Sequence, residues 1–136
     1  MKKILILLFS LTLAVVCASA QTQPQALSKK NLVVKEWNTD ARGAGKRLDH
    51  QTTYNADGKK IEEIEYNADG QKWRKRYEYA GDKCVKEMVY NDRNKLVSIK
   101  KFEYNELGKK KVQYNYDAKG KLLTIKTFEY ISRHAE

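Results

Sequence analysis

The stretch that decides the fold is YNADGKKIEEIEYNADGQKWRKRYEY, which covers residues 54–79. In it, tyrosine is followed twice by Asn-Ala-Asp-Gly, at 55–58 and at 67–70, and each of these segments leads into a strand-like one. Asparagine at the first position of such a turn accepts hydrogen bonds from the backbone that follows it. Glycine at the fourth position adopts the positive φ that a type I turn with a bulge requires. The stretch therefore predicts β-hairpin turns at both segments.

The same unit recurs through the rest of the chain. Turn segments of the same chemistry lie at 105–108 and 117–120. Tyrosines recur at intervals of 12, 13, 11, 14, 12 and 14 residues from Tyr54 to Tyr130. Internal repeats of this kind are considered before single-residue signals when a fold is predicted. Apolar residues stand two positions before most of these tyrosines, at Ile64, Tyr77, Met88, Phe102, Tyr114 and Phe128.

This spacing predicts strands. Residues two apart share one face of a strand, whereas a helix needs apolar residues three or four apart. The turns are too short for crossover connections, so consecutive strands must pair antiparallel. Two earlier segments, 32–37 and 46–54, add further strands and bring the total to about seven or eight. We therefore predict an all-β fold, an antiparallel meander.

The faces of the sheet are predicted by counting residues through the turns. The count places Tyr54, Tyr90 and Tyr116 on one face and Tyr66, Tyr79, Tyr104 and Tyr130 on the other. Both faces then mix apolar residues with Lys and Glu, whereas a half-buried sheet has one apolar face. This mixture favours a largely single-layer or curled sheet held by cross-strand pairs. A small closed up-and-down barrel, which would remove the two edges, is the alternative.

The first 20 residues, MKKILILLFSLTLAVVCASA, have the three parts of a cleaved secretory signal peptide. Lys2 and Lys3 begin it, an apolar run follows, and small residues end it at Ala20. The apolar run is shorter than the ~20 residues of a membrane span, so the mature chain is expected to have no transmembrane segment. We expect an exported protein of the periplasm, the outer surface or the medium.

The rest of the chain is expected to be one domain, because 136 residues rarely hold two. Residues 21–30 are predicted to be a flexible lead-in and residues 31–136 the β-hairpin repeat domain. Loss of the signal peptide lowers the net charge from +10 to +8. Cys84 is then the single cysteine, so no intramolecular disulfide is expected.

The repeated element Tyr-Asn/Asp-x-x-Gly, as in 54–59, 66–71, 104–109 and 116–121, resembles the YD repeat of RHS-type surface and toxin proteins. The whole arrangement of leader, Gln-rich segment and repeat is more similar to tyrosine-rich, short secreted proteins of unknown function from Bacteroides-like bacteria. The resemblance covers about residues 46–130. It implies a β-hairpin repeat in an extracytoplasmic setting, and it brings no catalytic residues with it.

The sequence lacks a catalytic constellation, so we expect no enzyme and no cofactor. The histidines are His50 and His134, and with Cys84 they do not have the spacing of a zinc site. The glutamates stand among lysines at strand positions, where cross-strand ion pairing explains them better than a glycosidase-like pair. A hydrolase is therefore the least favoured function.

Binding is the favoured function class, as an interaction module at the cell envelope. Aromatic rings interleaved with cations stack on sugars and attract anions, and the segment around Trp73 has this pattern. The candidate ligand-binding residues are Trp73, Arg74, Arg76, Tyr77 and Tyr79. In an exported protein, an anionic glycan, the phosphates of lipopolysaccharide or an envelope protein are expected partners, and nucleic acid is not. Alternatively, Trp73 packs against neighbouring strands, or edge strands drive self-assembly into a structural surface protein.

Overall fold

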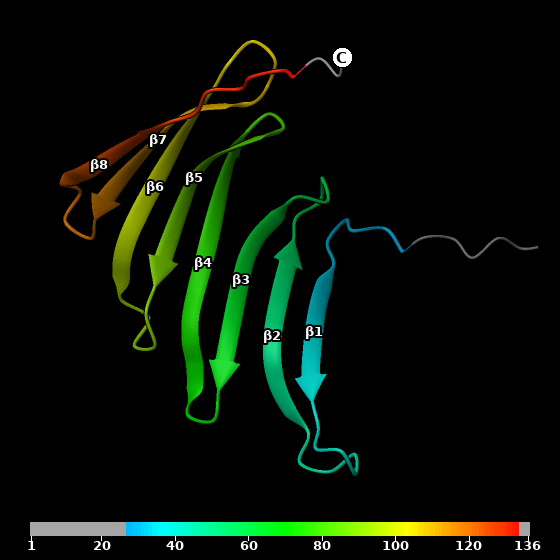
Figure 1. Cartoon of the computed structure of the whole chain (residues 1–136). Coiled ribbons are helices and arrows are strands. Elements are labelled where there is room, and N and C mark those ends of the chain that lie inside the picture. The colour runs from blue at the N-terminus through cyan, green and yellow to red at the C-terminus, as the bar shows by residue number, and fades with distance from the viewer. Residues whose placement is uncertain (1–26, 134–136) are drawn as a thin grey trace, which may run out of the picture.

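In a computed structural model, which describes residues 27–133, the chain forms a single antiparallel sheet of eight strands (Figure 1). The strands are β1 (Val33–Asn38), β2 (Arg47–Tyr54), β3 (Lys60–Asn67), β4 (Gly70–Ala80), β5 (Lys83–Tyr90), β6 (Leu96–Tyr104), β7 (Lys110–Asp117) and β8 (Leu122–Thr127). The predicted all-β meander is confirmed, and the segments predicted at 32–37 and 46–54 form β1 and β2. The predicted signal peptide, residues 1–20, lies outside the described residues. Within residues 27–133 there is no helix of the length and apolarity that a membrane crossing requires.

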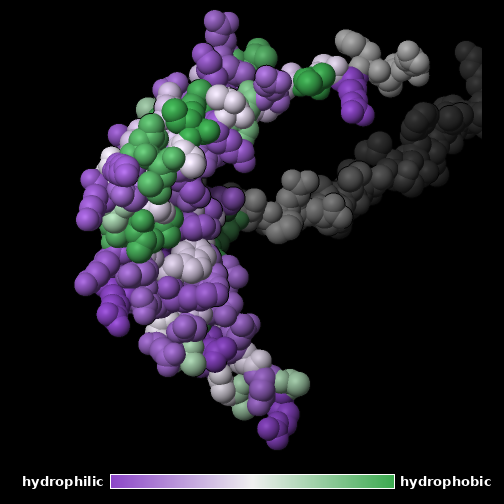
Figure 2. All heavy atoms as spheres, turned by 60° about the vertical axis from the view of Figure 1, so that its left-hand side comes forward, coloured by the Kyte–Doolittle hydropathy of each residue, from purple (hydrophilic) through white to green (hydrophobic). Residues whose placement is uncertain are grey.

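The strands lie side by side in chain order, and the sheet does not close. β1 forms one edge and β8 the other, and Figure 1 places these strands at opposite ends of the molecule. The closed-barrel alternative is therefore wrong. Sheet twist instead gives the molecule the curled outline seen in Figure 2.

The turns form as their residues predict. After β2, the Asn55 side-chain oxygen accepts hydrogen bonds from the backbone N–H of Asp57 at 3.0 Å and of Lys59 at 2.9 Å. Gly58 takes a φ of +74°, which closes the turn without steric cost. The equivalent Asn or Asp accepts the same two bonds in the turns that begin at 91, 105 and 117.

The predicted face assignment is wrong at one step. Tyr54, Tyr90, Tyr104 and Tyr116 each pair with a residue six positions later, but Tyr66 pairs with Gln71, five positions later. This tighter turn reverses the face of everything that follows, because a one-residue shift in register exchanges the two faces. Successive tyrosines therefore alternate throughout. Face A carries Tyr54, Tyr79, Tyr104 and Tyr130, and face B carries Tyr66, Tyr90 and Tyr116.

The sheet is a single layer with almost no core. Among the described residues, Phe102 and Thr52 are the buried ones, at 7% exposed each. Each strand contacts its neighbours in the sequence and no other strand in the described part of the chain. The fold is therefore held by ladder hydrogen bonds and cross-strand side-chain pairs, as the mixed faces predict.

A clamp of one lysine and one tyrosine joins the two strands of the hairpins β3–β4, β5–β6 and β7–β8 at the end away from the turn. The lysine Nζ lies over the tyrosine ring, 5.8 Å from its centre for Lys59 and Tyr79, with equivalent pairs in the next two hairpins. The tyrosine hydroxyl donates a hydrogen bond to the backbone oxygen of the residue after that lysine. These bonds are Tyr79 to Lys60 at 2.8 Å, Tyr104 to Cys84 at 2.6 Å and Tyr130 to Lys110 at 2.8 Å. The structural repeat is thus a clamped hairpin of two strands.

Candidate functional site

The five residues predicted to bind a ligand do not form one surface. All lie on β4, and side chains alternate between the faces of a strand. The register of β4 with β3 and β5 therefore places Trp73, Tyr77 and Tyr79 on face A and Arg74 and Arg76 on face B. The basic and aromatic residues that follow one another in this part of the sequence therefore point to opposite faces of the sheet.

On face A, Trp73 and Tyr77 are engaged by neighbouring side chains. Lys75 Nζ lies 4.6 Å from the centre of the Trp73 ring, and His50 meets that ring edge-on. The Tyr77 hydroxyl donates a hydrogen bond to Glu63, which also accepts one from Lys60 at 2.6 Å. These packed and hydrogen-bonded side chains hold β2, β3 and β4 together.

The same contacts shift two pKa values. Burial and the hydrogen bond to the Glu63 carboxylate raise the pKa of Tyr77 far above its usual value. For Glu63, burial acts to raise the pKa, but the hydrogen bonds from Lys60 and Tyr77 outweigh it and lower the pKa. His50 Nε2 lies 4.0 Å from Glu63. The carboxylate is therefore held ionised by its neighbours.

On face B, Arg74 is also engaged within the sheet. Its guanidinium lies 4.6 Å from the centre of the Tyr90 ring and 3.9 Å from Glu62. Arg76 is exposed and pairs in the register with Glu62 and Met88. The arginines thus belong to a surface with nearby carboxylates rather than to a cationic patch.

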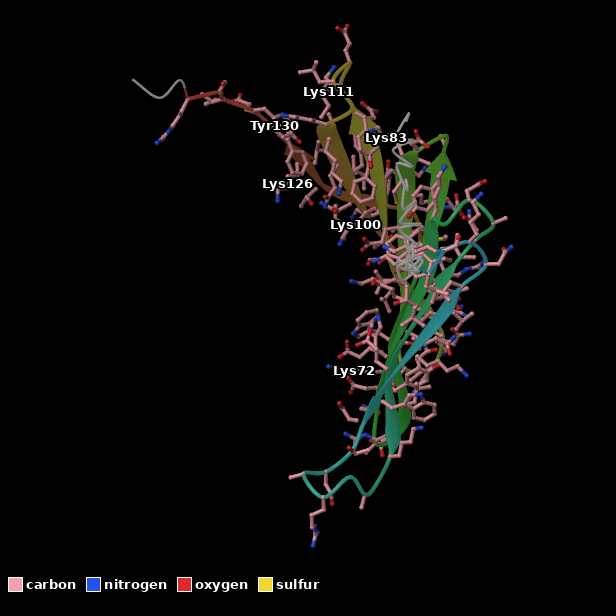
Figure 3. The ribbon with its side chains drawn as sticks, turned by 90° about the vertical axis from the view of Figure 1, so that its right-hand side faces the viewer. Lys72, Lys83, Lys100, Lys111, Lys126 and Tyr130 are labelled. Atoms are coloured by element: carbon pink, nitrogen blue, oxygen red, sulfur yellow. The ribbon has the colours of Figure 1, made fainter. Side chains whose placement is uncertain are left out.

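A different group of residues does form a basic and aromatic surface. It lies on face A of β5–β8 and combines cations from separate strands with the rings that they cover. We call it the basic face, and it consists of Lys100, Lys110, Lys126, Phe102, Tyr104, Phe128 and Tyr130. Lys83 and Lys109 stand next to the face-A residues Cys84 and Lys110, so they belong to face B in the register, but their ammonium groups reach the rings of Tyr104 and Tyr130. Figure 3 shows Lys100 and Lys126 projecting from the same side of the sheet.

Each ring of the basic face has a lysine ammonium against it. Lys110 Nζ lies 4.1 Å from the centre of the Phe102 ring, and Lys126 Nζ lies 5.3 Å from that of Phe128. Attraction between an ammonium and the ring face contributes about 0.5–1 kcal/mol at exposed sites. The lysine stems therefore cover the rings while their charges remain at the surface.

Few carboxylates neutralise this face. Glu87 lies on it and is bonded to Lys100 at 3.0 Å, and it is only 15% exposed. Lys83, Lys109, Lys110 and Lys126 form no ion pair with any residue in 27–133. On face A itself, Lys110 and Lys126 consequently stand as uncompensated positive charges beside four aromatic rings.

The opposite face of the same strands is balanced in charge. Here an open hollow of about 570 Å³ lies between β4 and β7. At its rim, Lys86 pairs with Glu78 at 3.2 Å, and the Tyr114 hydroxyl donates to Glu103 at 3.1 Å. In β5–β8, carboxylates therefore accompany Lys86 and Lys101 on face B, whereas Lys110 and Lys126 on face A have none bonded to them within residues 27–133.

His50 and Cys84, the residues that a nucleophilic pair would need, lie on β2 and β5, which are not adjacent strands. Over residues 27–133, no three side chains of the types His, Cys, Asp and Glu gather as a metal site would require. Cys84 is half-buried, and this burial raises the pKa of its thiol, which disfavours the nucleophilic thiolate. His50 lies on β2, and its near neighbours are Trp73 and Glu63 rather than Cys84.

Sequence reasoning missed the basic face because its residues come from separate strands. No short window of the sequence contains it, and its detection needs the correct face for every strand. The tighter turn at 67–70 is the detail on which that assignment depends. The alternation of lysine positions with Phe102, Tyr104, Phe128 and Tyr130 was the available signal.

Comparison with known proteins gives little. No family model and no curated protein matches the chain. Among solved structures, one of S. aureus TarM in complex with fondaparinux, alpha-GlcNAc-glycerol and UDP was matched at a TM-score of 0.30 and 14% identity. The match covers 74% of this chain and 20% of that one, and at this TM-score it has no bearing on fold or function.

Proposed function

We propose that the chain is an exported, non-enzymatic binding module of the cell envelope, and that its basic face binds an anionic glycan. The observation that carries this proposal is the segregation of charge in β5–β8. Lys110 and Lys126 lie on face A without an ion pair to any residue in 27–133. On face B, Lys86 is paired with Glu78, and Lys101 lies around the same hollow as Glu78 and Glu103. Selection for a soluble sheet alone would not require the two faces to differ in this way.

The aromatic rings define the kind of anion. A polyanion held by charge alone needs only lysines, but a sugar ring also stacks its C–H face on an aromatic side chain. Tyr104 and Tyr130 lie on alternate strands, so about 10 Å separates equivalent points on them. Regularly spaced rings between ammonium groups suit an extended chain of acidic sugars. The acid is either a carboxylate of a polysaccharide or a phosphate of lipopolysaccharide.

The test measures binding to polygalacturonate, to lipopolysaccharide and to dephosphorylated lipopolysaccharide, with dextran as a neutral glycan. The test variant is Lys110→Gln/Lys126→Gln, which removes two charges from face A. Each lysine near an anionic surface contributes about 1 kcal/mol, so the double substitution should weaken binding about thirtyfold. Binding should also fall steeply as salt is added, because the charges are exposed. Loss of binding on dephosphorylation identifies phosphate as the ligand group, and retention on polygalacturonate identifies carboxylate.

The matched control is Lys86→Gln/Lys101→Gln, which removes the same charge from the opposite face of the sheet, on the neighbouring strands β5 and β6. It should leave the affinity within a few-fold of the original protein. Trp73→Ala serves as a second control, because Trp73 lies on β4 outside the basic face. Equal losses in both double variants would show that net charge alone drives binding and would refute the proposed site. Equal binding to dextran would refute the proposed ligand class.

A further inference from the structure

Strand β8 is an open and apolar edge. Each of its residues is exposed, and Leu123 and Ile125 are 58% and 56% exposed. Figure 2, which brings the β8 side forward, shows apolar side chains gathered in patches there. In Figure 1 the residues after β8 run on beyond the strand, past the β6–β7 turn, and do not fold back along its outer edge. A long edge of this kind commonly pairs with another strand.

The backbone groups that face outward on β8 follow from its pairing with β7. Phe128 N–H donates to the Lys111 oxygen, which makes 128 and 111 a hydrogen-bonded pair. Because such pairs alternate along an antiparallel ladder, Lys126 and Thr124 also point inward. The N–H and C=O groups of Ile125 and Thr127 therefore point away from the sheet.

Strand β1 has the complementary arrangement at the other edge. Tyr54 N–H donates to the Leu32 oxygen, so Val34 and Glu36 point inward to β2. The backbone groups of Val33, Lys35 and Trp37 then point outward. Val33 and Trp37 are also apolar side chains left exposed, at 49% and 47%.

One register joins β8 to β1 of a second copy and pairs the outward-facing backbone N–H and C=O groups of both edges. With Ile125 opposite Trp37 and Thr127 opposite Lys35, outward-facing backbone groups meet each other. The same register places Lys126 opposite Glu36 and Phe128 opposite Val34 on face A. It therefore brings together an ion pair, an aromatic–aliphatic pair and two exposed apolar side chains, and each such cross-strand pair is favourable.

We propose that the protein assembles head to tail, with β8 of one copy pairing antiparallel with β1 of the next. The contact is heterologous, so each copy keeps one free edge of each kind and the assembly extends. Pairing of β8 with β8 is disfavoured, because a two-fold axis through the paired edges would place two basic faces beside each other on one side of the sheet. In the head-to-tail contact, the basic face instead meets the part of face A that carries Glu36, Glu63 and Glu65.

The experiment is sedimentation velocity on the full chain, exported by its own leader and purified, from micromolar to millimolar concentration. We expect mass to rise with concentration without stopping at a dimer. Glu36→Lys and Lys126→Glu should each weaken association about tenfold, and the double variant with both changes should restore it. Thr127→Pro should abolish association, since proline removes an outward N–H while the ladder to β7 is kept. Circular dichroism checks that each variant remains folded.

A strictly monomeric protein over the whole range would overturn the proposal, as would a stable dimer that Glu36→Lys does not affect. Failure of the double charge exchange to restore association would exclude the stated register and partner. If Thr127→Pro abolishes association but changes at Glu36 do not affect it, then β8 binds a strand other than β1. Lys35→Glu is the matched control, because this residue lies opposite a threonine in the proposed register.

Discussion

Tyr104→Phe tests the lysine–tyrosine clamp that joins β5 to β6. The substitution removes the hydroxyl that donates to the Cys84 oxygen at 2.6 Å. It keeps the aromatic ring, over which Lys83 Nζ lies at 5.6 Å from the centre. The change therefore isolates one hydrogen bond between β6 and the start of β5 without altering the volume packed there.

The expected loss of stability is that of one neutral hydrogen bond, about 1 kcal/mol. It is not expected to reach the cost of a fully buried unsatisfied carbonyl, because Cys84 is only half-buried and water can reach its backbone. A loss of 1 kcal/mol lowers the melting temperature by about 4 °C or more in a domain of this size. Tyr104→Leu should cost more, since it also removes the attraction between Lys83 and the ring.

The assay is urea unfolding followed by circular dichroism, with melting temperature as a second measure. Tyr54→Phe is the control, because Tyr54 has Lys29 over its ring at 5.6 Å but no hydroxyl bond to any residue in 27–133. It should leave the unfolding midpoint nearly unchanged. Equal losses for Tyr54→Phe and Tyr104→Phe, at equal slopes, would refute the role given to the hydroxyl.

The remaining predictions concern acid stability, thiol reactivity and one turn. Glu63 has a folded-state pKa below its ordinary value of 4.5, so its stabilising effect is present above that pH and is lost as the pH falls through the folded pKa. Glu63→Gln should therefore flatten the fall in stability measured by acid titration below pH 4.5, and an unchanged acid profile would contradict this. In the folded protein, Cys84 should react slowly with iodoacetamide at mildly alkaline pH, because burial raises the pKa of its thiol. In urea it should react at the rate of a free thiol. Equal rates for the folded and the unfolded protein would be inconsistent with the structure. Gly108→Ala should lower the free energy of unfolding by about 1–2 kcal/mol, because alanine is strained at the φ of +70°. The loss should be somewhat larger than for Gly120→Ala, since a methyl group at Gly108 would lie 2.8 Å from Lys83 Nζ. Urea midpoints measure both, and a larger loss at Gly120, where no atom lies within 4 Å, would contradict the contact.

Local chemistry explains why the meander was predictable. The Asn or Asp that begins a turn and the glycine that ends it act within five residues, so their effect is visible in any short window. The open sheet was also predictable, because lysines and glutamates on both faces leave no apolar face to bury. Strand order followed from turn length alone.

The faces and the basic face were not predictable from the same signals. Turns 55–58 and 67–70 have identical sequences. Before the first turn, Tyr54 pairs with Lys60, six positions later, but before the second, Tyr66 pairs with Gln71, five positions later. The two turns differ in backbone conformation, with Gly70 at a φ of +117° and Gly58 at +74°. One such step changes the face of every later residue, and with it the grouping of the lysines.

Because each strand contacts only its neighbours, the number of strands in this sheet can change without disturbing the packing of the others. A clamped hairpin contributes its own ladder, its own lysine and its own tyrosine, and it requires nothing from a hairpin two places away. Whole hairpins can then be gained or lost by duplication or deletion without remaking a core. In such an array the number of hairpins sets the reach of the molecule and the number of lysine–tyrosine clamps along it, independently of the chemistry of each unit.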